Sequence, residues 1–387
     1  MKRQRRSSSR ETVDFGVGYM EDNVLAMLDS QGVKDAESIR DDKLSFLDVV
    51  FEEFVMPEKA RPSKSIYRAV YSCLRESKSM EVAMASYRLL KDLDEVVISY
   101  ASEVPYKNVS CITSLNLSSL ARDLMVKESP ICAFQFPVKT LVFRHFIDQL
   151  VKDFEQTRAS FDGANMERFC VYKQLEMCGG NSSFDKILLE LLHFSLEGVT
   201  ENNSSLQYFD IIYKSTQALI SLLFHLDELK TSLTKDYIDQ LVDKLFKNNG
   251  EKMPIFLEAI QKPEQKLQFV MECFVKLFSS RRPPIDFSSF EVLLQRFDDR
   301  TAQVLLKESQ SQLLLAHAFQ AILCINPSDG SSIAGLFIAA FEKLQAVPRD
   351  FIVHPTAKQA LVVAEIFIGC DSAVECSSDS FVVMVSY

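Results

Sequence analysis

Glycine, proline and tryptophan are scarce in this chain. Among 387 residues there are 11 glycines, 12 prolines and no tryptophan. Glycine and proline together fall far below the roughly 12% expected from average usage. Sheet proteins and nucleotide-binding α/β folds need many tight turns and close backbone approaches, so this shortage disfavours both classes. It favours long helices.

Closely spaced cysteines and long apolar runs are also missing. The nine cysteines are scattered, and no two of them have the spacing of a metal-binding or redox pair. No stretch approaches the ~18 uninterrupted apolar residues of a membrane span, and the charged amino terminus leads into no apolar signal segment. These absences predict a protein of a reducing compartment, without a membrane partner, whose thiols are free and mostly buried.

An excess of positive charge is absent as well. The formal net charge is -10 and the pI is about 5.2. An acidic body repels the phosphate backbone, which disfavours DNA binding by the surface as a whole. The same charge attracts a basic patch on a protein partner.

What the chain does contain is helical periodicity. Hydrophobic residues make up 47% of the sequence, and phenylalanine, with 29 copies, is frequent at positions three or four apart. Leu44, Leu47, Phe51 and Phe54 form one such apolar stripe, and Pro263 is placed to begin another helix. No repeat with a fixed signature emerges. The predicted fold class is therefore all-α, as an irregular helical bundle or an armadillo- or HEAT-like α-solenoid.

Three segments depart from this pattern. We expect residues 1–19 to form a disordered basic tail and residues 20–370 to form one helical scaffold. Within the scaffold, the proline- and serine-rich stretch at about 101–137 predicts an irregular insert. Residues 371–387 form an atypical tail, whose end, F-V-V-M-V-S-Y, is typical of a strand or a loose end.

One histidine is a candidate catalytic residue. His317 lies in S-Q-L-L-L-A-H-A-F-Q-A-I-L, and no Asp, Glu or Ser lies within one helical turn of it. We expect a core histidine, because a catalytic role would require a carboxylate or thiol from another helix. The pairs Cys170/Cys178 and Cys370/Cys376 match no ligand spacing.

The sequence therefore predicts no catalytic residue, no cofactor-binding residue and no metal ligand. A hydrolase or transferase centred on His317 or on a cysteine remains a competing hypothesis. The acidic run D-L-D-E, Asp92–Glu95, is expected to be a helix end or a solvated face.

The amino-terminal run is strongly basic. Lys2, Arg3, Arg5 and Arg6 lie within five residues. Such a cluster predicts a nuclear localisation signal, with a phosphate-contacting arm or a solubilising tail as alternatives.

Six segments follow one another along the chain: E-D-N-V-L-A-M-L-D-S-Q-G-V-K-D, R-D-D-K-L-S-F-L-D-V-V, I-Y-R-A-V-Y-S-C-L-R, M-A-S-Y-R-L-L-K-D-L, F-L-E-A-I-Q-K-P-E-Q-K-L-Q-F-V-M-E-C-F-V-K and L-L-L-A-H-A-F-Q-A-I-L. Taken in this order, they resemble the family of plant negative regulators of systemic acquired resistance. The resemblance covers about residues 20–98 and 250–369. The stretch around 280–310 is shorter than the family pattern, and neither the tail 371–387 nor the cluster Lys2–Arg6 matches it.

The resemblance implies a non-enzymatic armadillo-like scaffold in the nucleus. It implies a subunit of the structural maintenance of chromosomes five/six complex, paired with a helical partner subunit and reaching chromatin indirectly. The implied roles are the DNA damage response, homologous recombination and repression of plant defence genes, with no cofactor and no small-molecule substrate. The alternative is a transcriptional corepressor that binds DNA directly through its basic amino-terminal tail.

Overall fold

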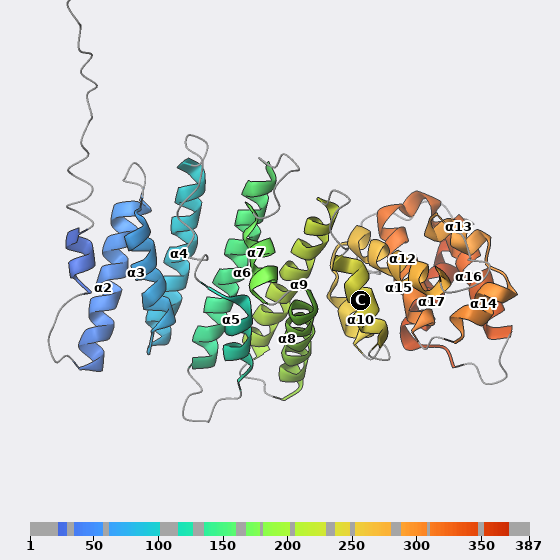
Figure 1. Cartoon of the computed structure of the whole chain (residues 1–387), viewed down its shortest axis with the longest axis horizontal. Helices are drawn as coiled ribbons and strands as arrows, with labels where there is room; N and C mark the ends of the chain where they lie inside the picture. Colours follow the sequence, from blue (N-terminus) through green and yellow to red (C-terminus); the bar gives the residue numbers. More distant parts are fainter. Residues whose placement is uncertain are drawn as a thin grey trace, which may run out of the picture. The chain divides into compact units, whose positions relative to one another are not determined.

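The described part of the chain is helical. The computed structural model describes residues 22–28, 35–56, 62–100, 115–126, 135–159, 168–178, 181–201, 206–229, 237–247, 252–279, 288–307, 310–346 and 352–370. These ranges contain helices and turns but no strand, which confirms the predicted all-α fold (Figure 1). The predicted tails at 1–19 and 371–387, and with them Lys2, Arg3, Arg5 and Arg6, lie outside these ranges.

The contacts group the chain into two compact units, Met1–Leu150 and Val151–Tyr387. The boundary falls inside helix α6 (Gln135–Ala159). The sequence predicts one scaffold over residues 20–370 and gives no sign of this division, because the helical periodicity continues through Leu150. The two units are described separately below.

The described residues of unit 1 form a short helix at residues 22–26, four longer helices and the first part of α6. The four are α2 (Ala36–Phe54), α3 (Lys64–Arg75), α4 (Met80–Tyr100) and α5 (Leu117–Met125). Helices α2, α3 and α4 pack on one another. Figure 1 shows them side by side in blue and cyan.

Short polar side chains determine where these helices begin. The Asp35 carboxylate accepts a hydrogen bond from the Ser38 backbone N–H at 2.7 Å. The Ser63 hydroxyl accepts from the backbone N–H groups of Ser65 and Ile66 and so caps α3. Each cap satisfies N–H groups that have no partner within the helix, a contribution of about 1 kcal/mol.

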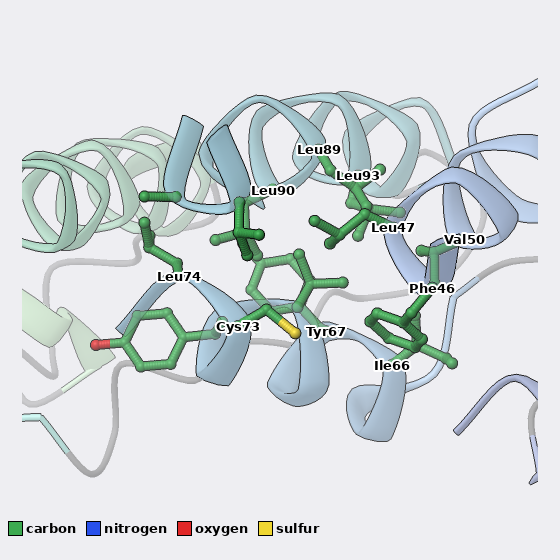
Figure 2. Packing of buried hydrophobic residues seen from close by; sticks show 14 of the residues in the cluster. Phe46, Leu47, Val50, Ile66, Tyr67, Cys73, Leu74, Leu89, Leu90 and Leu93 are labelled. Atoms are coloured by element: carbon green, nitrogen blue, oxygen red, sulfur yellow. The ribbon is translucent and has the colours of Figure 1, made fainter. Parts of the chain in front are cut away.

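The core of unit 1 lies between α2, α3 and α4. Phe46, Val50 and Ile66 are fully buried, and Figure 2 shows Phe46 beside Ile66. Leu90 of α4 and the ring of Tyr67 from α3 are also buried in this layer. Full burial of one such side chain contributes about 1.5–3 kcal/mol, so this layer is the main source of stability in the unit.

Two details of unit 1 differ from the sequence prediction. The predicted stripe on α2 includes Phe51, but this ring is 41% exposed, and Phe46 and Val50 lie inside instead. The buried side of α2 is thus rotated relative to the predicted one. Within the segment 101–137, predicted to be irregular, residues 117–125 form helix α5, which begins after the Asn116 cap. The prediction of an irregular insert is wrong for that helix.

The described residues of unit 2 form twelve helices after α6. They are α7 (Cys170–Met177), α8 (Asn181–Glu201), α9 (Leu206–Glu228), α10 (Tyr237–Lys247), α11 (Met253–Ala259), α12 (Pro263–Ser279), α13 (Phe290–Gln295), α14 (Asp299–Leu305), α15 (Ser311–Ile325), the 3-10 helix η4 (Pro327–Asp329), α16 (Gly330–Ala346) and α17 (Pro355–Cys370). The closest packing is between α8 and α9, between α12 and α15, and between α16 and α17. Helices α8 and α9, and likewise α16 and α17, are sequence neighbours, as in helical-repeat proteins. Helix α12 instead packs on α15 across the intervening helices α13 and α14.

Phenylalanines fill the layers between these helices. The rings of Phe319 and Phe337 stack with centroids 4.2 Å apart, and Phe256 lies 4.9 Å from Phe269. Such pairs contribute about 0.5–1.5 kcal/mol beyond the area that they bury. The high phenylalanine content of the sequence thus serves the contacts between helices.

Glycine permits two very close helix contacts in unit 2. A Cβ atom at Gly198 of α8 would lie 2.1 Å from the Phe209 ring of α9, and one at Gly330 would lie 2.3 Å from the Phe367 ring of α17. Real Cβ atoms do not approach other atoms so closely, so an alanine at either position would force the phenylalanine ring to move.

No single helix in the described ranges has the length and hydropathy of a membrane span. Helix α15 together with residues 327–346 passes that test only as a pair, with a bend of 115° between its halves.

Candidate interaction site

His317 lies in the core of unit 2, as the sequence predicts. The side chain is 5% exposed, and Leu313, Leu314 and Ala321 around it on α15 are buried. Neither ring nitrogen has a hydrogen-bond partner. Burial, with the nearby positive charge of Lys266, lowers the pKa of His317 to about 3. The ring is therefore neutral at physiological pH and has no hydrogen-bonded group with which to exchange a proton, so no general base is assembled here.

The buried cysteines are poor nucleophiles. Burial raises the pKa of the Cys73 thiol to about 11 and that of Cys170 to about 12, and it raises the pKa of Cys273 as well. Since the thiolate is the reactive form, these three groups are inert at neutral pH. No group of three His, Cys, Asp or Glu side chains within the described ranges could hold a metal ion.

Unit 1 contains a buried polar cluster that the sequence did not predict. It consists of Tyr67 from α3, Asp94 from α4, and His145 and Gln149 from α6, each at most 5% exposed. The Tyr67 hydroxyl donates to Asp94, and the Gln149 amide donates to Tyr67 at 3.1 Å and to Asp94. His145 Nε2 lies 3.5 Å from the Tyr67 hydroxyl.

Asp94 thus corrects the prediction that the D-L-D-E run is a helix end or a solvated face, because the run lies within α4 and Asp94 is buried. This residue lies four positions after the buried Leu90, so its place on the apolar side of α4 was available from the spacing. Hydrogen bonds to both Asp94 oxygens stabilise the buried carboxylate. The cluster connects three helices and fixes their register, which is a structural role.

An exposed acidic surface lies on the outward side of α2. Glu37, Asp41, Ser45, Asp48 and Glu52 follow one another at steps of three or four residues and are all exposed. They therefore line one side of the helix, turned away from the buried residues. Arg40 pairs with Asp41 at 3.1 Å and with Glu37 at 3.6 Å, so one cation on the helix is shared by two of these carboxylates.

Exposed apolar side chains accompany the acidic ones. Phe51 is 41% exposed and Met56 is 49% exposed. We refer to Asp41, Asp48, Phe51 and Glu52 of α2, together with Met56 just beyond the end of this helix, as the α2 face. Exposed aromatic residues beside charges of one sign are typical of protein-binding surfaces, where the apolar groups contribute affinity and the charges select the partner. The α2 face is suited to a partner that is basic and apolar.

Comparison with known proteins gives one match that bears on function. No protein-family model matches the sequence, and no solved structure does. The negative regulator of systemic acquired resistance SNI1 of Arabidopsis thaliana is 23% identical over 422 aligned residues, covering 92% of this chain and 96% of the regulator. The chain is similar to this regulator along almost its whole length.

The similarity confirms the resemblance found in the separate sequence segments. The name of the Arabidopsis protein describes regulation of a plant defence response and no reaction. This agrees with the buried, neutral His317 and the protonated core thiols.

Proposed function

We propose that this chain is a non-enzymatic repressor of plant defence genes that acts in the nucleus. It works as a scaffold subunit of the structural maintenance of chromosomes five/six complex, in the DNA damage response and homologous recombination. It binds a helical partner subunit and reaches chromatin indirectly. The observation that carries the proposal is the similarity to the Arabidopsis regulator over 92% of the chain.

The α2 face supports a scaffold role and supplies the docking surface. Its carboxylates attract a basic partner, and Phe51 and Met56 supply apolar area that becomes buried on binding. A stable pairing needs about 1,600 Å² of buried surface in total, so neighbouring helices of unit 1 contribute to the contact as well. Removal of an aromatic anchor from such an interface costs at least about 2 kcal/mol.

Affinity purification from plant nuclei tests this proposal. The tagged chain is expected to recover the subunits of the five/six complex in fixed proportion, and cross-links are expected at α2. Phe51→Ser combined with Met56→Ser should reduce recovery of the partner at least tenfold. Val275→Ser is the matched control, because Val275 is 48% exposed on α12 of unit 2. Purification of the chain alone, with no subunit of the complex, would contradict the proposal.

The second candidate is a corepressor that binds DNA directly. The four cations among residues 2–6 favour it, because such a cluster can contact phosphates. This function requires DNA binding by the isolated protein that weakens steeply with salt and disappears when Lys2, Arg3, Arg5 and Arg6 become alanine. Affinity that survives those substitutions rules it out.

A further inference from the structure

Three segments of unit 2 meet at the side chain of His225. This residue lies near the end of α9, and its side chain is only 19% exposed. The imidazole stacks on the Phe154 ring of α6, with centroids 5.9 Å apart and an angle of 25° between the planes. Lys262, which directly precedes Pro263 at the start of α12, contacts the imidazole from the third segment.

The hydrogen bonds of His225 determine which ring nitrogen carries the hydrogen. Lys262 Nζ lies 2.8 Å from His225 Nε2, and Glu228 Oε2 lies 3.1 Å from His225 Nδ1. An ammonium group has donors only, so Lys262 donates to Nε2. The hydrogen of the neutral imidazole is then on Nδ1, which donates to the Glu228 carboxylate. His225 therefore directs its basic nitrogen at the lysine.

This order of groups is the general arrangement of an activated nucleophile. A nucleophile within hydrogen-bond distance of a base, with the base oriented by a third group, is the diagnostic geometry. Here Lys262 takes the place of the nucleophile, His225 that of the base and Glu228 that of the orienting group. Arg158 of α6 pairs with Glu228 at 3.6 Å and so helps to position its carboxylate.

The surroundings favour transfer of a proton from Lys262 to His225. After transfer, the positive charge lies on the imidazolium, beside the Glu228 carboxylate and against the face of the Phe154 ring. Both of these groups attract a cation. The amine that is left on Lys262 belongs to an exposed side chain, so a co-substrate can reach it from solvent.

The available groups select the chemical class of that co-substrate. A base activates the amine, and the acyl donor must then carry a group that leaves without being protonated first. A thioester meets this condition, because a thiolate is a far weaker base than an alkoxide or an amide anion. An acyl thioester is therefore the donor that this arrangement fits.

We propose that Lys262 is an acyl-acceptor site of this chain, modified by acyl thioesters with His225 as the base. One proton of the Lys262 ammonium passes to His225 Nε2, and the amine attacks the carbonyl carbon of the thioester. A C–N bond forms, the C–S bond breaks and the thiolate leaves. The nitrogen then loses a second proton to water, and His225 releases the first.

The products are an uncharged N-acyl lysine and a thiol. Of the two protons that the nitrogen has lost, one ends on the thiolate and the other in solvent. This modification goes beyond the proposed function and does not depend on it, because it concerns the chemistry of the chain alone.

Incubation of the full-length chain with acetyl-coenzyme A, followed by mass spectrometry of each lysine over time, tests the proposal. Lys262 is expected to be acetylated about tenfold faster than Lys214. Lys214 is the internal reference, because it lies on α9 and pairs with the Asp210 carboxylate at 2.8 Å. His225→Gln should reduce the rate at Lys262 to that at Lys214, since glutamine accepts a hydrogen bond but cannot take the proton.

Two further variants separate the loss of a base from a change in packing. His193→Gln removes the histidine of another His–Glu pair, with Glu197 on α8 at 3.4 Å, and should leave both rates unchanged. Imidazole added to His225→Ala should restore the rate at Lys262 relative to that at Lys214. A lost packing contact predicts no such rescue.

Glu228→Gln keeps the imidazole in place and supplies a second test if His225→Gln unfolds the chain. The rate at Lys262 should fall about threefold in this variant, because the base loses its orienting carboxylate. Equal rates at Lys262 and Lys214 in the wild-type chain would overturn the proposal. So would a rate at Lys262 that neither His225→Gln nor Glu228→Gln lowers.

Discussion

The ring of His317 combines deep burial with two nitrogen atoms that have no hydrogen bond. A buried polar group without a partner costs about 1–3 kcal/mol, even when neutral. Protonation of this ring adds a further cost, because its pKa of about 3 in the folded chain lies below the value of 6.5 for an exposed histidine. The unfolded chain therefore binds more protons between these two values, and stability falls as the pH drops below 6.5.

His317→Leu should consequently stabilise the protein. We expect a gain of about 1–3 kcal/mol in the free energy of unfolding at pH 7 from removal of the unpaired polar group. The wild-type chain should also lose about 2 kcal/mol more than the variant between pH 7 and pH 5. Urea unfolding at the two pH values measures both effects. His193→Leu, on an exposed part of α8, is the control; a destabilised His317→Leu would contradict the prediction.

Asp185 of α8 has the opposite pH dependence. Burial raises the pKa of its carboxyl group to about 6, although the charge of Lys244 on α10 partly opposes the shift. The folded chain thus holds this proton more tightly than the unfolded chain, whose value is 3.8. Stability from this group is present below pH 4 and is lost as the pH rises towards 6.

Asp185→Asn should remove the loss of stability that the buried carboxyl group causes as the pH rises. At pH 7 we expect the variant to be more stable than the wild type by up to about 3 kcal/mol, with little difference at pH 4. Thermal unfolding across this range measures the difference, and Asp48→Asn on the exposed side of α2 serves as the control. Equal stability at pH 7, or a gain that is larger at pH 4, would show that folding does not raise the pKa of this carboxyl group.

The Tyr67 hydroxyl is a donor to Asp94 and an acceptor from Gln149 within the core of unit 1. Tyr67→Phe removes this hydroxyl and leaves the buried carboxylate with one donor fewer. We expect a loss of about 2–4 kcal/mol in the free energy of unfolding. A double-mutant cycle with Asp94→Asn should give a coupling energy above about 0.5 kcal/mol. Additive losses would show that the cluster is not a connected network.

At the scale of helices, the contact of α8 with α9 depends on Gly198. A methyl group at this position would overlap the Phe209 ring, whereas one at Gly335 of α16 would have no atom within 4 Å. Gly198→Ala should therefore destabilise unit 2 by about 1–3 kcal/mol. Gly335→Ala should stabilise it by about 0.5–1 kcal/mol, because alanine favours the helix. Chemical unfolding compares the two, and a stabilising Gly198→Ala would show that α9 moves aside at no cost.

Most helices could be predicted from the sequence. Which side of each helix is buried, and which helices contact one another, could be predicted less well. Pro263 begins α12 as predicted, since proline is favoured in the first turn of a helix. Helix α5 was missed because prolines and serines on both sides obscured the stripe of Leu117, Ala121 and Leu124. On α2 the spacing allows two neighbouring stripes, and only the packing on α3 and α4 decides that Phe51 lies outside. The α2 face could not be predicted for the same reason.

At the scale of the whole molecule, the division into two compact units is the main feature that the sequence does not reveal. Each unit has its own buried core, so a destabilising substitution in one unit should increase local unfolding in that unit alone. Phe46→Ala removes a fully buried ring from unit 1, a loss of about 3–5 kcal/mol. Hydrogen exchange should become faster in α2, α3 and α4 and stay unchanged in α12–α17. A uniform increase along the chain would show that the units unfold together.

Two of the few glycines in this chain lie at close contacts between helices. A sequence with 11 glycines places two of them where a single hydrogen atom separates backbone from an aromatic ring, at Phe209 and at Phe367. The spacing of α8 from α9 and the seating of α17 are therefore each encoded by the lack of one methyl group. Exchanges at Gly198 and Gly330 would alter the geometry of the scaffold while leaving its helix content intact, so circular dichroism would miss a change that partner binding would detect.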